Sequence, residues 1–189
     1  MFYSGRYYEA TLYFENMINS FRKNFFDLDT DQKRTFLETA YMLGFCYNEL
    51  GLPKQAFYYL DLLSDDGNIR HTMELVNAMA NSKDLRVFNY TEKVMDEVKR
   101  NFSEADELPD HIKDFINFLR RRRGYAYVDF EQLDQAEKIF TQMLDEEENA
   151  DYAINELAYI KKLRQQRGED VTADAGNASD DGNDQAQGK

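Results

Sequence analysis

The chain has 189 residues and a formal net charge of -13 at pH 7, and its single cysteine, Cys46, excludes an intramolecular disulfide. The length predicts one domain with a buried core, and the negative charge argues against nucleic acid or an anionic membrane surface as a partner. No apolar stretch approaches the roughly 20 residues that span a bilayer, so we expect no membrane insertion.

Cysteine usage and the lack of a basic-flanked apolar leader slightly favour a cytoplasmic protein. A piece of a longer exported protein would show the same two features, so the sequence does not decide the location.

Helix-forming residues fill the chain, and the helix breakers are scarce, with nine Gly and two Pro. This composition predicts an all-α protein. The first helix follows Gly5, and Asp29 or Thr30 can cap the second. A tight turn at Gly51 and Pro53 leads into the third. The eight helices predicted in chain order cover residues 6–21, 31–50, 54–64, 69–81, 84–101, 110–128, 132–145 and 149–166.

The last part of the chain, residues 167–189, differs sharply from the rest. It contains one valine and no aromatic residue, and its acidic residues outnumber its basic ones. Such a segment buries too little apolar surface to offset the entropy cost of ordering. We therefore expect a helical domain over 1–166 and a disordered acidic tail over 167–189.

Two segments of the chain repeat one pattern, "AYMLGFCYNELGLPKQAFYYL" at 40–60 and "RRRRGYAYVDFEQLDQAEKIF" at 120–140. Both keep a Gly, a Tyr, an Ala and a large apolar residue at the same spacings. The aligned residues are Gly44, Tyr47, Ala56 and Leu60 in the first segment, and Gly124, Tyr127, Ala136 and Phe140 in the second.

This pattern resembles the tetratricopeptide repeat, which runs Trp-x2-Leu-Gly-x2-Tyr, then Ala-x3-Phe, then Pro. The match has departures, since Ala40 stands in the Trp position and Arg120 and Arg123 stand in the Trp and Leu positions of the later segment. The resemblance implies a right-handed α-α superhelix, a solenoid of about eight helices in antiparallel pairs. The unit at 69–101 fits this array by position only.

The N-terminus fits the second half of such a repeat, because Ala10 and Phe14 match the Ala-x3-Phe positions and Gly5 matches the turn before them. The first unit thus lacks its first helix. Either the chain is a piece of a longer array or the array begins with an unpaired helix.

Catalytic and metal-binding patterns are weak. Asp27, Asp29, Asp31 and Glu38 have the spacing of a calcium loop, but Gln32 stands where that loop needs glycine, so they are better explained as helix-capping residues. No phosphate loop, nucleophile triad or zinc spacing is present. We expect no enzyme activity, no metal and no cofactor, and we expect Cys46 to be a core residue.

By the resemblance, the first helix of each pair lines a concave groove. That expectation selects two one-sided stripes at three- and four-residue steps. The predicted partner-binding residues are Glu38, Tyr41, Phe45, Asn48 and Glu49 in the first stripe, and Phe118, Arg121, Arg122, Tyr125, Val128 and Asp129 in the second. Within the run of four arginines, we expect Arg120 and Arg123 to meet acids of neighbouring helices, and Arg121 and Arg122 to hold an acidic group of a partner.

These features favour a protein–protein interaction module that binds a peptide or helix of a partner, which can be acidic. A structural or oligomerising domain of a longer repeat protein, associating through its exposed end, is the alternative. A module that handles a ligand or polysaccharide is a third reading, since a repeat scaffold does not specify its cargo.

Overall fold

The structure is a computed structural model that describes residues 5–22 and 25–169, and this part of the chain is helical with no strand. Its α-helices are α1 (Tyr7–Arg22), α2 (Thr30–Glu49), α3 (Pro53–Leu60), α4 (Ile69–Asn81), α5 (Arg86–Asn101), α6 (Asp110–Asp129), α7 (Leu133–Gln142) and α8 (Ala150–Gln166). Two short 3-10 turns, Phe25–Asp27 and Asp61–Leu63, follow α1 and α3.

Over residues 5–22 and 25–169, the prediction of an all-α fold with eight α-helices is confirmed. The predicted helix over 54–64 is divided between α3 and the 3-10 turn at Asp61–Leu63. Helix α5 begins two residues later than predicted because Asp84 accepts hydrogen bonds from the backbone and side chain of Arg86 and stays outside the helix. Most of the predicted tail, from 170 on, lies outside the described residues.

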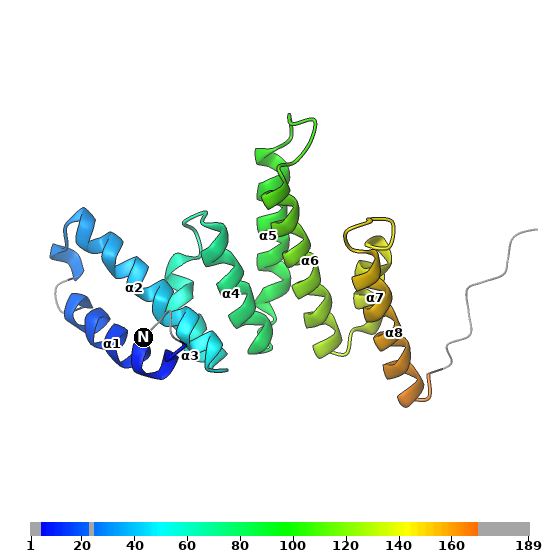
Figure 1. Cartoon of the computed structure of the whole chain (residues 1–189), viewed down its shortest axis with the longest axis horizontal. Helices are drawn as coiled ribbons and strands as arrows, with labels where there is room; N and C mark the ends of the chain where they lie inside the picture. The colour runs from blue at the N-terminus through cyan, green and yellow to red at the C-terminus, as the bar shows by residue number, and fades with distance from the viewer. Residues whose placement is uncertain (1–4, 23–24, 170–189) are drawn as a thin grey trace, which may run out of the picture.

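The helices form a row along the long axis of the molecule, from α1 at one end to α8 at the other (Figure 1). Each helix contacts the next in the chain, and α4 also contacts α2 and α6. Helices α2, α4 and α6, each the first helix of a predicted pair, are therefore neighbours in space. In the sequence, α3 separates α2 from α4, and α5 separates α4 from α6.

Four helices, α2, α4, α6 and α8, end in the same left-handed turn. Positive φ angles occur just after each one, at Gly51, Lys83, Glu131 and Gly168. In every case the following residue donates its backbone N–H to the carbonyl five positions earlier, as Leu52 does to Tyr47 at 2.8 Å and Gln132 does to Tyr127 at 2.8 Å. This turn satisfies carbonyls that the helix end leaves open. The shared ending marks α4 as equivalent to α2 and α6, although the sequence of 69–101 lacks the repeat residues.

The turn at Glu131 carries a conformational cost, because a side chain at a φ of 61° is strained. We expect Glu131→Gly to raise the free energy of unfolding by about 0.5–1 kcal/mol in urea titrations. Glu131→Ala is the matched control, because both variants remove the exposed Arg167 pair but only glycine relieves the strain. Equal stability of the two variants would contradict the expectation.

The two repeat segments pack through the same contact. A Cβ atom added at Gly44 would lie 2.4 Å from Cγ of Leu60, and one added at Gly124 would lie 2.4 Å from Cζ of Phe140. Glycine is thus required for α3 to lie close to α2, and for α7 to lie close to α6. Leu60 and Phe140 are fully buried by these crossings, which confirms the internal equivalence inferred from sequence.

Candidate functional site

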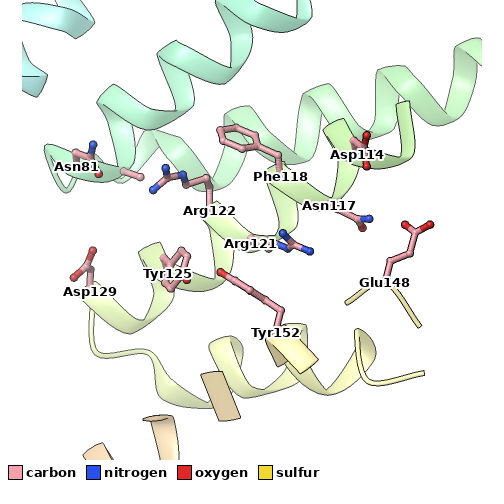
Figure 2. Close-up of a pocket in the computed structure, with 11 residues that line it drawn as sticks. Asn81, Asp114, Asn117, Phe118, Arg121, Arg122, Tyr125, Asp129, Glu148 and Tyr152 are labelled. Atoms are coloured by element: carbon pink, nitrogen blue, oxygen red, sulfur yellow. The ribbon is translucent and has the colours of Figure 1, made fainter. Parts of the chain in front are cut away.

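A cavity with a volume of about 900 Å³ lies on α6, between the C-terminal end of α4 and the start of α8 (Figure 2). Its walls come from alternate helices of the row together with the turn before α8. It is lined by Ala80, Asn81, Asp114, Asn117, Phe118, Arg121, Arg122, Tyr125, Asp129, Glu148 and Tyr152.

Five of the predicted partner-binding residues of α6 line this cavity: Phe118, Arg121, Arg122, Tyr125 and Asp129. Apart from the adjacent pair Arg121 and Arg122, they are separated by three or four residues, which places them on one face of the helix. The sixth, Val128, instead packs against the core cluster formed by α7 and α8. Its side chain is therefore a core contact rather than part of the cavity wall.

Arg121 is held in place by Tyr152 of α8 and by Asn149, the residue just before α8. Its Nη2 donates a hydrogen bond to Oδ1 of Asn149, and its guanidinium lies 4.3 Å from the ring centroid of Tyr152. Its Nε is buried without a hydrogen-bond partner. Arg121 thus anchors α6 to α8 and has one donor left unsatisfied.

Arg122 differs from Arg121. Its guanidinium lies 5.6 Å from the ring centroid of Phe118, and in Figure 2 it points toward Asn81 while that of Arg121 points toward Asn117 and Glu148. In the described part of the chain no carboxylate lies within 4.0 Å of its guanidinium, although Glu74 of α4 is close enough to interact with its charge, which opposes the rise that burial causes in the pKa of Glu74. Arg122 is the cation in this cavity with donors available to a ligand.

The other two arginines of the run pair with acids, as predicted, although Glu146 lies in the turn between α7 and α8 rather than on a helix. Nη1 of Arg120 donates to both carboxylate oxygens of Glu146, at 2.7 and 2.8 Å. Nη2 of Arg123 lies 3.3 Å from Oε2 of Glu92 on α5. Arg120 and Arg123 therefore meet acids of the chain itself, and neither lines the large cavity.

Two tyrosines form the wall between α6 and α8. The hydroxyl of Tyr125 donates to Oε1 of Glu156 at 3.1 Å, and its ring lies edge-on to Tyr152 with centroids 6.1 Å apart. Burial raises the pKa of both Tyr125 and Tyr152 above the usual tyrosine value. Both phenols are therefore neutral at pH 7, and the hydroxyl of Tyr152 is buried without a partner.

The stripe predicted on α2 does not line this cavity. Glu38 and Glu49 are exposed. The ring of Tyr41 lies tilted against that of His71 of α4 at a centroid distance of 4.5 Å, and Phe45 lies against Tyr7 of α1 at 6.0 Å. The structure therefore does not bring the two predicted stripes together into one pocket.

Asn48, the remaining member of that stripe, connects α2 to α4. Its Nδ2 donates to the backbone oxygen and to Oε2 of Glu74, at 3.0 and 2.8 Å. Burial raises the pKa of Glu74, while hydrogen bonds from Asn48 and Asn77 act in the opposite direction. Glu74 is thus a partly desolvated acid between α2 and α6.

A raised pKa means that the folded state favours the protonated form of Glu74, so its contribution to stability falls as pH rises through that pKa. We expect Glu74→Gln to stabilise the protein at pH 7 by less than about 1 kcal/mol, because glutamine still accepts from Asn48 and solvent screens part of the charge. The gain should disappear at pH 4. Urea titrations at both pH values, with the exposed Glu38→Gln as control, measure it, and an equal gain at both pH values would refute the explanation.

Sequence reasoning missed six of the cavity residues: Ala80, Asn81, Asp114, Asn117, Glu148 and Tyr152. Asp114 and Asn117 lie on α6 before Phe118, where the predicted stripe begins. The others belong to α4, to α8 and to the turn that precedes α8. Applying the three- and four-residue spacing used for α6 to α4 and α8 would have found the position of Tyr152.

Asp29, one of the acids with the spacing of a calcium loop, caps a helix instead. The side chain of Asp29 accepts from the backbone N–H of Gln32, and Gln32 accepts from that of Asp29, which makes a capping box at the start of α2. No group of three or more His, Cys, Asp or Glu side chains in residues 5–22 and 25–169 is placed to hold a metal ion. Burial raises the pKa of the Cys46 thiol to about 11, so it is a protonated core residue.

No helix in the described part of the chain is both long and apolar enough to cross a membrane. No family model, curated protein or solved structure matches the chain. The tetratricopeptide resemblance therefore stays a prediction drawn from the residues.

Proposed function

We propose that this chain is a non-enzymatic interaction module, and that the cavity on α4, α6 and α8 holds a peptide or helix of a partner protein. The scaffold in this proposal is a tetratricopeptide-like solenoid of antiparallel helix pairs. The repeated left-handed turns and the two glycine crossings support that scaffold, because the pairs α2–α3 and α6–α7 share the same turn and the same close crossing.

The observation that carries the proposal is an arginine without a close salt bridge in an aromatic-walled cavity. Phe118, Tyr125 and Tyr152 supply the apolar walls, and Arg122 supplies free donors beside them. Aromatic residues and arginine are the side chains that most often dominate binding energy at protein interfaces. An open cavity of about 900 Å³ has room for several side chains of a bound segment.

The charges around the cavity indicate what the segment carries. Arg122 favours a carboxylate, which a guanidinium binds through two parallel hydrogen bonds. Asp114, Asp129 and Glu148 also line the cavity, and they repel a run of acids. We therefore infer a single acidic residue flanked by apolar or basic ones.

Selection from a random peptide library displayed on phage, with the full chain as bait, tests this function. We expect enriched peptides with one conserved acid and neighbouring apolar residues. Arg122→Gln should weaken a selected peptide about tenfold, the loss typical of a charge-assisted hydrogen bond, and binding should weaken with salt.

Arg100→Gln on α5 is the matched control, because Arg100 is exposed and bonds only to the backbone of Asp96 in its own helix. It should leave peptide affinity unchanged. Failure to enrich any peptide, or equal affinity of the wild type and Arg122→Gln, would overturn the proposal.

A second candidate function is assembly through α1. Tyr8, Leu12 and Tyr13 on this helix are exposed at 64%, 48% and 61%. The residue equivalent to the fully buried Leu60 and Phe140 is Phe14, which is only half-buried. In the pairs α2–α3 and α6–α7, the first helix covers the equivalent residue. An additional helix, from a longer chain or from a second copy, would therefore cover Phe14 and complete the unit at α1.

Light scattering coupled to size-exclusion chromatography tests assembly of this chain with itself. Self-association through α1 predicts a mass that rises with protein concentration and a monomer for Tyr13→Lys. Tyr159→Lys on α8, where Tyr159 is exposed at 49%, is the control and should leave the mass unchanged. A monomer at every concentration would reject the second copy as the covering element.

A further inference from the structure

A second cleft, of about 550 Å³, lies between α5, α6 and α7 and is distinct from the cavity described above. Its lining includes four basic residues, Lys99, Arg120, Arg123 and Lys138, and no acidic residue. These arginines occupy a different face of α6 from Arg121 and Arg122. In a chain with a net charge of -13, a cleft whose charged lining residues are all basic is an unexpected concentration of positive charge.

Nearby acids neutralise part of this charge. Glu146 pairs with Arg120, Glu92 pairs with Arg123, and Asp96 lies 3.8 Å from Lys99. Four positive and three negative groups leave a local charge of +1. Lys138 has no salt-bridge partner in the described part of the chain.

Arg123 adds a donor that the protein does not satisfy. Its side chain is 18% exposed, and its Nη2 contacts Glu92 at 3.3 Å. Its Nε is buried without a hydrogen-bond partner. A buried N–H without a partner is costly unless water or a ligand accepts from it.

The rest of the lining is apolar. Met95, Ile116 and Ile139 contribute from three different helices, and Tyr127 closes one side with its ring stacked on Phe88 at a centroid distance of 4.2 Å. An ion alone would leave these surfaces uncovered. A ligand that fills the cleft needs an apolar body as well as an anionic group.

We propose that the cleft between α5, α6 and α7 is a binding site for a small organic anion, which carries a carboxylate or phosphate group on an apolar body. The anionic group accepts from Arg123 and pairs with Lys138, and the body lies on Met95, Ile116 and Ile139.

Amide chemical shifts in nuclear magnetic resonance spectra of the full chain test this site, with phenyl phosphate, benzoate, inorganic phosphate and benzyl alcohol as separate probes. We expect saturable shifts at Ile116 and Ile139 with one or both aromatic anions, at a dissociation constant of about 1 mM, as is usual for ligands of this size. Phenyl phosphate and benzoate distinguish the two anionic groups. Inorganic phosphate and benzyl alcohol should each bind more weakly because each lacks half of the ligand.

Lys138→Gln should weaken the better anion about fivefold, and Lys138→Arg should restore binding. Lys161→Gln on α8, an exposed lysine outside the cleft, should have no effect. Arg122→Gln should also have no effect, which separates this site from the proposed peptide site.

Three outcomes would overturn the proposal. The first is the absence of saturable shifts with either aromatic anion. The second is equal affinity of Lys138→Gln and the wild type. The third is binding of benzyl alcohol as tightly as the anions, which would show an apolar cleft without anion recognition.

Discussion

Replacing Gly44 with leucine should lower the free energy of unfolding by about 1–3 kcal/mol or more, because even a Cβ at this position would lie 2.4 Å from Cγ of the buried Leu60. The close approach of α2 and α3 cannot be kept with a larger side chain between them. Urea titration followed by circular dichroism at 222 nm measures the loss. A change within about 0.5 kcal/mol, the range of ordinary surface substitutions, would contradict the proposed crossing.

A double-mutant cycle isolates the contact itself. In the wild type, Gly44→Ala should destabilise the protein although alanine is the better helix former by about 1 kcal/mol. In a Leu60→Ala background the colliding atoms are absent, and Gly44→Ala should become neutral or stabilising. The same effect of Gly44→Ala in both backgrounds would show that Leu60 is not the obstacle.

Phe140→Ala should cost about 3–5 kcal/mol, the usual range for a fully buried phenylalanine. Phe140 fills the crossing at Gly124, and its ring centroid lies 6.3 Å from that of Tyr125 and 6.2 Å from that of Tyr152. Its loss therefore also removes support from the wall of the candidate site. Urea titration measures the stability, and near-ultraviolet circular dichroism reports the packing of the two tyrosines.

Phe26→Ala is the matched control, because Phe26 is 95% exposed. It should change stability by no more than about 0.5 kcal/mol. If Phe140→Ala proved as mild as this control, Phe140 could not be the centre of the α6–α7 crossing.

The helices and the two glycine crossings could be predicted from the sequence because they depend on local pattern. Apolar residues at helical spacing predict α2 and α6, and the spacing from Gly44 to Leu60 recurs from Gly124 to Phe140. The equivalence of α4 to these helices could not be predicted. It depends on a turn in which Lys83 takes the left-handed conformation that Gly51 takes after α2. A lysine does not indicate such a turn in the sequence.

The candidate site was predictable only in part, since one helix face can be read from sequence but its neighbours cannot. Phe118, Arg121, Arg122, Tyr125 and Asp129 share a face of α6 by periodicity alone. Which of them stays available depends on long-range packing. Tyr152 of α8 and Asn149, the residue just before α8, hold Arg121 in place. Arg122 is therefore the arginine of this face that is available to a ligand.

The same limit applies to α2. Tyr41 and Asn48 fit a groove-facing stripe, yet the proximity of α2 to α4 engages both of them with His71 and Glu74. Sequence spacing does not show how closely successive first helices approach each other.

The proposed function is tested most directly by locating a bound peptide. Amide chemical-shift mapping of the full chain with a phage-selected peptide should give its largest changes at residues around the cavity on α4, α6 and α8, including Asn81, Phe118, Tyr125 and Tyr152. These changes should be lost in Arg122→Gln. Changes confined to α1, or to the cleft between α5, α6 and α7, would contradict the account.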